Sequence, residues 1–165
     1  MRRRSCLVLI TAAAMAAIAA ASDWKTYVNE RFGATAEIPA GYVAGEAPAN
    51  GDGLRFTSPG GDATISVWGA LAGLDEESFA EYTRRLVSYD DDDGWTVSYS
   101  AGQAGWFAFS GSKAGRIFYE KIVQACEGQI VNHVRLDYPA ARKAEFDPIV
   151  AHVAKSLRSG KGWQC

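Results

Sequence analysis

Alternating apolar and polar residues dominate the second half of the chain. Four segments with strand character follow one another, at residues 95–100, 106–110, 116–125 and 129–138. The glycine-bearing separators between them are too short for a crossover helix, so these strands are expected to run antiparallel, as a meander. Residues 116–125 are apolar on both faces, which predicts a central strand covered on both sides.

The first half adds shorter strands. Residues 24–28 and 35–38 have strand character, and Pro39 ends the second of them. Residues 54–58 and 63–70 predict a hairpin around the turn Pro59-Gly60-Gly61-Asp62. In the second strand of that hairpin, Ile65 and Val67 alternate with Ser66 and Trp68. The whole pattern predicts one central antiparallel sheet of about six to eight strands.

Two helices accompany the strands. The acidic segment 74–78 is expected to open the first, with Phe79, Tyr82 and Leu86 on one apolar stripe and the acidic run 90–93 at its end. The second is expected to be interrupted at Pro148, with Asp147 as the N-cap of its main part. The fold class predicted is therefore α+β, with two main helices packed on the sheet.

The amino terminus has the composition of a secretory signal peptide. Arg2, Arg3 and Arg4 precede an apolar run that ends at Ala19-Ala20-Ala21, a small-residue cleavage pattern. We expect residues 1–21 to be removed and residues 22–165 to form a single globular domain, periplasmic or secreted. No second long apolar stretch follows, so no stable membrane insertion is expected after cleavage.

Net charge narrows the range of partners. Without the three signal arginines, the 17 basic residues fall to 14 against 19 acidic ones, a net charge of −5. An acidic domain without a basic stripe is not expected to bind nucleic acid. A possible partner is another protein of the cell envelope.

Whether the cysteines form a disulfide depends on this export. Cys6 belongs to the signal segment, which leaves Cys126 and Cys165. An even pair in an oxidising compartment is more often bridged than free, so a structural disulfide between Cys126 and Cys165 is predicted. Two unpaired thiols are the alternative. A redox-active pair is disfavoured because the chain has no C-x-x-C spacing.

One catalytic motif occurs. Ser110-Gly111-Ser112-Lys113 matches S-x-x-K, in which a serine nucleophile is activated by a lysine one helical turn later. Here the motif falls between strands, and neither S-D-N nor K-T-G follows, so a chance match is favoured. A secreted serine hydrolase or peptidoglycan-active enzyme that uses Ser110 and Lys113 remains the alternative function.

No cofactor or metal is predicted. His133 and His152 are isolated from cysteine or carboxylate spacings typical of metal ligands, so structural or solvent-exposed roles are expected. The run Asp90-Asp91-Asp92-Asp93 invites a calcium hypothesis, but it lacks the order of an EF-hand loop. A solvated loop is favoured.

Two tryptophans are candidate ligand-binding residues. Trp68 lies on the opposite face of its strand from Ile65 and Val67. Trp106 likewise lies on the opposite face from Phe107 and Phe109. They predict either an exposed aromatic surface or a sheet face that a second helix covers.

The order of elements resembles a known fold. The chain is similar to small exported bacterial proteins of uncharacterised function whose layout is that of the PsbP-like fold, an antiparallel sheet between helices also found in a Ran-binding import factor. The segments that carry the resemblance are Thr35-Ala36-Glu37-Ile38-Pro39, Asn50-Gly51-Asp52-Gly53, Phe56-Thr57-Ser58-Pro59 and the closing helix from Tyr138-Pro139 to Leu157. The chain departs from PsbP relatives at Gly41-Tyr42, where they tend to have a tryptophan.

The resemblance implies a fold and a non-catalytic role, and no functional residue carries over. The function predicted is an exported, non-enzymatic accessory or binding domain, acting on a ligand or on a protein partner.

Overall fold

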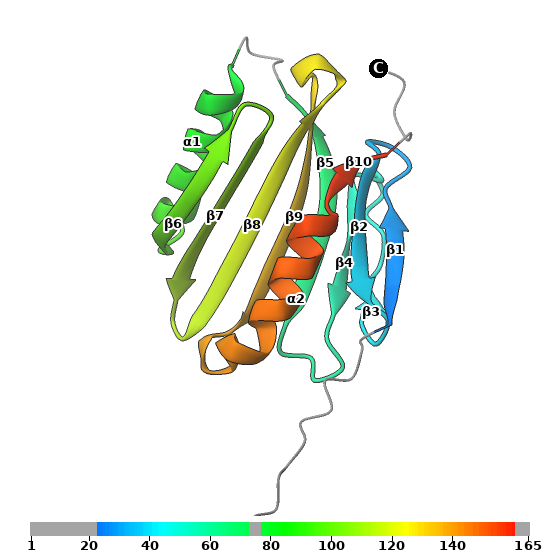
Figure 1. Ribbon diagram of the computed structural model, residues 1–165, viewed down its shortest axis with the longest axis vertical. Helices are drawn as coiled ribbons and strands as arrows, with labels where there is room; N and C mark the ends of the chain where they lie inside the picture. Colours follow the sequence, from blue (N-terminus) through cyan, green and yellow to red (C-terminus); the bar gives the residue numbers. More distant parts are fainter. Residues whose placement is uncertain (1–22, 73–76, 161–165) are drawn as a thin grey trace, which may run out of the picture.

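The computed structural model describes residues 23–72 and 77–160. Its largest element is a seven-stranded antiparallel sheet with the order β3-β4-β5-β9-β8-β7-β6. Figure 1 shows this sheet with α1 toward one edge and α2 across its middle. The strands of the sheet are β3 (Val43–Ala44), β4 (Gly53–Thr57), β5 (Thr64–Leu71), β6 (Thr96–Gln103), β7 (Trp106–Lys113), β8 (Arg116–Ala125) and β9 (Ile130–Pro139). The predicted meander is confirmed as β6 to β9.

A second, smaller sheet contains both ends of the described chain. It has three strands in the order β1-β2-β10, which are β1 (Trp24–Val28), β2 (Ala34–Pro39) and β10 (Arg158–Ser159). The two early strands predicted from the sequence therefore form a layer of their own. Close approach of this layer to the main sheet depends on small residues. A Cβ atom on Gly69 of β5 would lie 2.2 Å from the Cβ of Phe32.

Helix α1 (Phe79–Asp92) covers one face of the main sheet. Ser78 is its N-cap, and Ser78 and Glu81 form a capping box. The helix starts at Phe79, later than the predicted start within residues 74–78, and residues 74–76 of that segment lie outside the described residues. Tyr82 of α1 packs with a buried cluster from β7, β8 and β9, which consists of Phe109, Phe118, Ile122 and Val131.

Helix α2 (Lys143–Ser156) lies on the opposite face and follows a short 3-10 turn (Ala140–Arg142). The predicted break at Pro148 is wrong, because Pro148 lies inside one continuous helix. Proline costs a helix the hydrogen bond that its missing N–H would donate. Burial of Phe146, which is 2% exposed and stacks on Tyr138 with the ring centroids 4.8 Å apart, favours helix before the proline. Asp147 is not an N-cap, since its carboxylate instead accepts from Lys143 at 2.7 Å.

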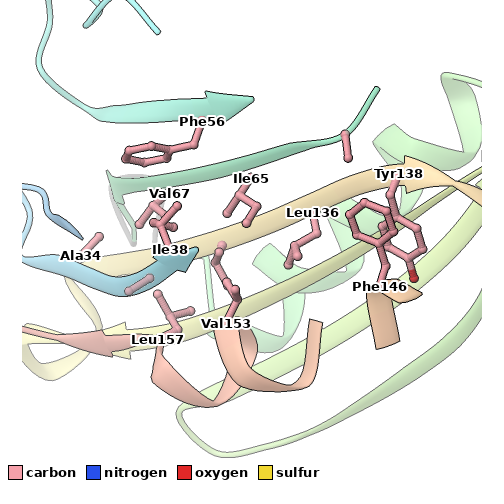
Figure 2. Close-up of a cluster of buried hydrophobic side chains, with 13 residues drawn as sticks. Ala34, Ile38, Phe56, Ile65, Val67, Leu136, Tyr138, Phe146, Val153 and Leu157 are labelled. Carbon is pink, nitrogen blue, oxygen red and sulfur yellow. The ribbon is translucent and has the colours of Figure 1, made fainter. Parts of the chain in front are cut away.

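The larger core lies between the main sheet, the small sheet and α2. Figure 2 shows Ile38 of β2, Ile65 of β5 and Leu136 of β9 pointing into the same space as side chains from α2. Both faces of the main sheet thus pack against other elements, and this confirms the predicted α+β class. Of the helices in the described part of the chain, none is long and apolar enough to cross a membrane.

Candidate functional site

A groove lies between α2 and the outer strands of the main sheet. Helix α2 packs on β2, β8 and β9, and Figure 1 shows β6 and β7 continuing beyond it without a helix in front of them. The groove has a volume of about 830 Å³. It is mostly apolar, with aromatic residues from the sheet and the small side chains Val150, Ala151 and Ala154 from α2.

Strand register explains the aromatic side of the groove. Ser110 of β7 lies opposite Tyr99 of β6 and Tyr119 of β8, so all three side chains point to the same face. The rings of Tyr99 and Tyr119 are stacked with centroids 6.5 Å apart. Tyr99 is 48% exposed. Burial raises the pKa of Tyr119, and Tyr99 adds to the effect.

Lysines give the groove its charge. The Nζ of Lys121 lies 6.0 Å from the Trp106 ring centroid and donates to the backbone carbonyl of Ala154 at 2.8 Å. Burial lowers the pKa of Lys121. Lys155 lies on the α2 side. The carboxylate of Asp147 is already paired with Lys143, which points to an excess of positive charge in the groove.

The two predicted tryptophans do not share a site. Trp106 lines the groove on the α2 face. Trp68 lies directly opposite His133 on β9 and stacks on it at 4.6 Å, on the face that α1 covers. Both side chains are half-buried. Only Trp106 is therefore kept as part of the candidate site, and its role in binding stays a prediction.

Beneath α1 lies a polar network that the sequence did not reveal. The hydroxyl of Tyr82 is 2.9 Å from Nε2 of His133, and Nδ1 of His133 is 2.9 Å from a carboxylate oxygen of Glu120. The other oxygen of Glu120 accepts from Arg135 at 2.9 Å, and Arg135 also donates two hydrogen bonds to Asp90. His133 and Glu120 are both buried, and a structural role for His133 stays a prediction.

This network fastens α1 to the sheet. Tyr82 and Asp90 come from the helix, while Glu120, His133 and Arg135 come from β8 and β9. An acidic residue in the last turn of a helix opposes the helix dipole, and the ion pair with Arg135 compensates for that at Asp90. Burial lowers the pKa of Arg135, but Asp90 and Glu120 outweigh it and raise the pKa overall. The network therefore holds α1 against β8 and β9 through buried and partly buried polar contacts.

The raised pKa of Tyr82 predicts that the stability of the protein depends on pH. Burial, reinforced by the charge of Glu120, raises its pKa from 10.0 to about 12. Between these two values the unfolded chain releases the phenol proton while the folded protein keeps it, so the free energy of unfolding is expected to fall as pH rises from 10 to 12. Urea titrations across this interval should show a smaller fall for Tyr82→Phe. An equal fall in both proteins would contradict the assignment.

Ser110 and Lys113 do not form a catalytic pair. The Ser110 hydroxyl donates to the carbonyl of Phe118 at 2.6 Å. Lys113 is three residues away on the same strand, so its side chain points to the opposite face. There it donates to the carbonyl of Asp93 and lies 5.9 Å from the ring centroid of Trp95. The lysine is therefore not placed to activate the serine.

Metal ligation has no support in the part of the chain that the structure describes. No group of three or more His, Cys, Asp or Glu side chains converges there. The aspartate run is not a solvated loop, because Asp90, Asp91 and Asp92 belong to α1. His152 is partly exposed, stacks on Trp24 at 3.7 Å and contacts Glu37 at 2.5 Å.

The predicted signal segment 1–21 and Cys165 lie outside the described residues. Cys126 opens a short 3-10 turn after β8, where it has a φ of 50°. Both the cleavage and the Cys126–Cys165 bridge stay predictions.

Comparisons with known proteins agree on the architecture. No family model and no curated protein sequence matches the chain. The solution structure of cyanobacterial PsbP (CyanoP) from Synechocystis sp. PCC 6803 is similar, with a TM-score of 0.62 and 13% identity over 87% of this chain and 95% of that one. The chain has the PsbP-like fold. The predicted resemblance is thereby confirmed at the level of the fold.

The PsbP-like fold also includes a Ran-binding protein. The crystal structure of Mog1p from Saccharomyces cerevisiae has a TM-score of 0.60 and 10% identity, and the match covers 84% of this chain and 96% of Mog1p. A mutant of Mog1 matches with a TM-score of 0.58, 10% identity and coverage of 83% and 96%. Identities this low show a shared fold only.

Proposed function

We infer that this chain is an exported, non-enzymatic domain that binds a protein of the cell envelope in the groove between α2 and strands β6 to β8. The groove is the observation that carries the proposal, because it joins aromatic side chains, an apolar wall and two lysines, Lys121 and Lys155, on one open face. Exposed apolar surface rimmed by polar groups is typical of protein-binding sites.

The fold supports a binding role in general terms. Mog1p is described as a Ran-binding protein. At 10% identity the nature of its partner does not transfer. What supports the proposal is that the same fold serves protein recognition elsewhere.

Photo-crosslinking tests the groove. A benzoyl-phenylalanine in place of Tyr99, in the full chain expressed in its own cells, is expected to yield an adduct with an envelope protein. Val43 on the short strand β3 is 66% exposed and is the matched control position. No protein adduct from position 99, or equal adducts from both positions, would contradict binding in the groove.

Export and the disulfide can be tested together. The intact mass of protein from the periplasm or medium is expected to lack residues 1–21. Cys126 and Cys165 are expected to take up an alkylating reagent only after reduction. A full-length product in the cytoplasm, with both thiols alkylated directly, would contradict both predictions.

We expect the protein to have no serine-hydrolase activity. A fluorophosphonate or β-lactam probe is expected to leave the protein unlabelled, because the Ser110 hydroxyl is engaged by Phe118 and Lys113 lies on the other face. Mass spectrometry of the probed protein is the measurement. Labelling that disappears in Ser110→Ala would overturn the non-enzymatic proposal.

A further inference from the structure

Building on the proposed function, we propose that the occupant of the groove is an amphipathic helix with an acidic flank, contributed by the partner protein and lying beside α2 on strands β6 and β7. The helix would complete a layer that covers only part of this face of the sheet.

The dimensions of the uncovered strip fit one helix. Adjacent strands are about 4.8 Å apart, so β6 and β7 together form a strip about 10 Å wide that α2 does not cover. Packed helices lie about 8–10 Å apart, which is the distance from α2 that the strip allows. Each of the two strands has eight residues, or about 26 Å, and a helix of about 17 residues has that length.

The walls suit a helix as well. Asp147, Val150, Ala151, Ala154 and Lys155 line the groove at three- and four-residue spacing, so one side of α2 faces it. Ala151 and Ala154 are small and permit close approach of a neighbouring helix. On the sheet side, Tyr99, Tyr119 and Trp106 offer large flat surfaces for leucine-sized side chains. An apolar stripe at positions i, i+3 or i+4, and i+7 would pack between these walls.

The positive charge of the groove favours a partner helix with acidic residues on its flank. Lys121 and Lys155 line the groove, and its carboxylate, Asp147, is paired with Lys143. Glutamate or aspartate beside the apolar stripe of the incoming helix would meet these lysines. A basic flank would be repelled.

The pattern of crosslinks distinguishes a helix from other occupants. Benzoyl-phenylalanine is placed separately at Tyr99 and at the exposed Ala151, which are on opposite walls of the groove. Mass spectrometry then maps the residues of the partner that carry the adducts. A helical occupant gives adducts three, four or seven residues apart. Adducts two residues apart would show an extended strand added to the edge of β6 and would overturn the helix, while the binding function would stand.

Charge reversal provides the second arm of the experiment. Lys155→Glu is expected to lower the crosslink yield from position 99 about five- to tenfold. Lys25→Glu on the exposed side of β1 is the matched control and should change nothing. Circular dichroism of both variants checks folding. Equal yields from the two variants, or adducts with a second copy of this chain, would overturn the acidic partner helix. If benzoyl-phenylalanine at position 99 or 151 gave no adduct even without the Lys155 or Lys25 substitution, the proposed function would be overturned as well.

Discussion

Replacing Glu120 with leucine is expected to lower the free energy of unfolding by about 3–5 kcal/mol. Glu120 is 3% exposed and holds two partners, His133 through one carboxylate oxygen and Arg135 through the other. Leucine fills a similar volume but accepts no hydrogen bond. The buried ring nitrogen of His133 and one side of the Arg135 guanidinium would then lack partners, and the cost of their burial would remain.

Equilibrium urea unfolding measures this loss. Glu30 is exposed in the turn between β1 and β2, and Glu30→Leu is the matched control, with an expected change within about 0.5 kcal/mol. The helix that Glu120 indirectly anchors, α1, should become easier to open, so its amides should exchange faster with solvent. A loss below about 1 kcal/mol for Glu120→Leu would show that the network contributes little to stability.

Replacing Phe118 with alanine is expected to cost about 3–5 kcal/mol. Phe118 is completely buried at the centre of the cluster under α1. Its ring makes edge contacts with Phe109 at 5.3 Å and with Trp95 at 5.0 Å. The guanidinium of Arg135 lies 3.9 Å from its centroid. Alanine would remove all three contacts and leave a cavity.

A graded pair of variants separates volume from aromatic contact. Phe118→Leu keeps most of the buried volume and should cost clearly less than Phe118→Ala in the same urea experiment. Ser112→Ala, at an exposed position of β7, is the control for strand substitution. If the alanine and leucine variants were equally stable, the side chain would not lie in a close-packed core.

Periodicity predicted most of the main sheet. The strand β8 was predicted with the bounds that the structure has, because apolar residues lie on both of its faces and glycine-bearing turns flank it. Its face toward α1 is filled by Phe118 and Ile122, and Ile117 and Val123 pack on the α2 side. Turn chemistry sets the register in such a meander, and both signals are local in the sequence.

Features that depend on distant segments were not predictable in this way. For His133 the sequence left a structural and a solvent-exposed role open, and the structure shows it buried beneath α1, where it contacts Tyr82. The single residue Pro148 suggested a helix break, but burial of Phe146 decided the outcome. In both cases packing between distant segments, which the local sequence does not contain, decided the outcome.

The candidate site was foreseen only in part. Trp106 was singled out because it lies off the main apolar set of its strand, and it does line the groove. Tyr99, Tyr119 and Lys121 carried no comparable signal, since each fits an ordinary alternating strand. The groove exists because α2 covers β8 and β9 but not β6 and β7, and that placement follows from packing between elements far apart in sequence.

The small sheet has a consequence for the order in which the protein can be assembled. Its middle strand β2 is made early, yet its partner β10 is among the last residues described, with Thr35 opposite Arg158. During synthesis from the amino terminus, that edge of β2 cannot pair with β10 until residues 158 and 159 have been made. Contacts of such long sequence separation slow folding. Until they form, the start of β2 at Ala34 and Thr35 has an open edge that can pair with other nascent strands, which favours aggregation.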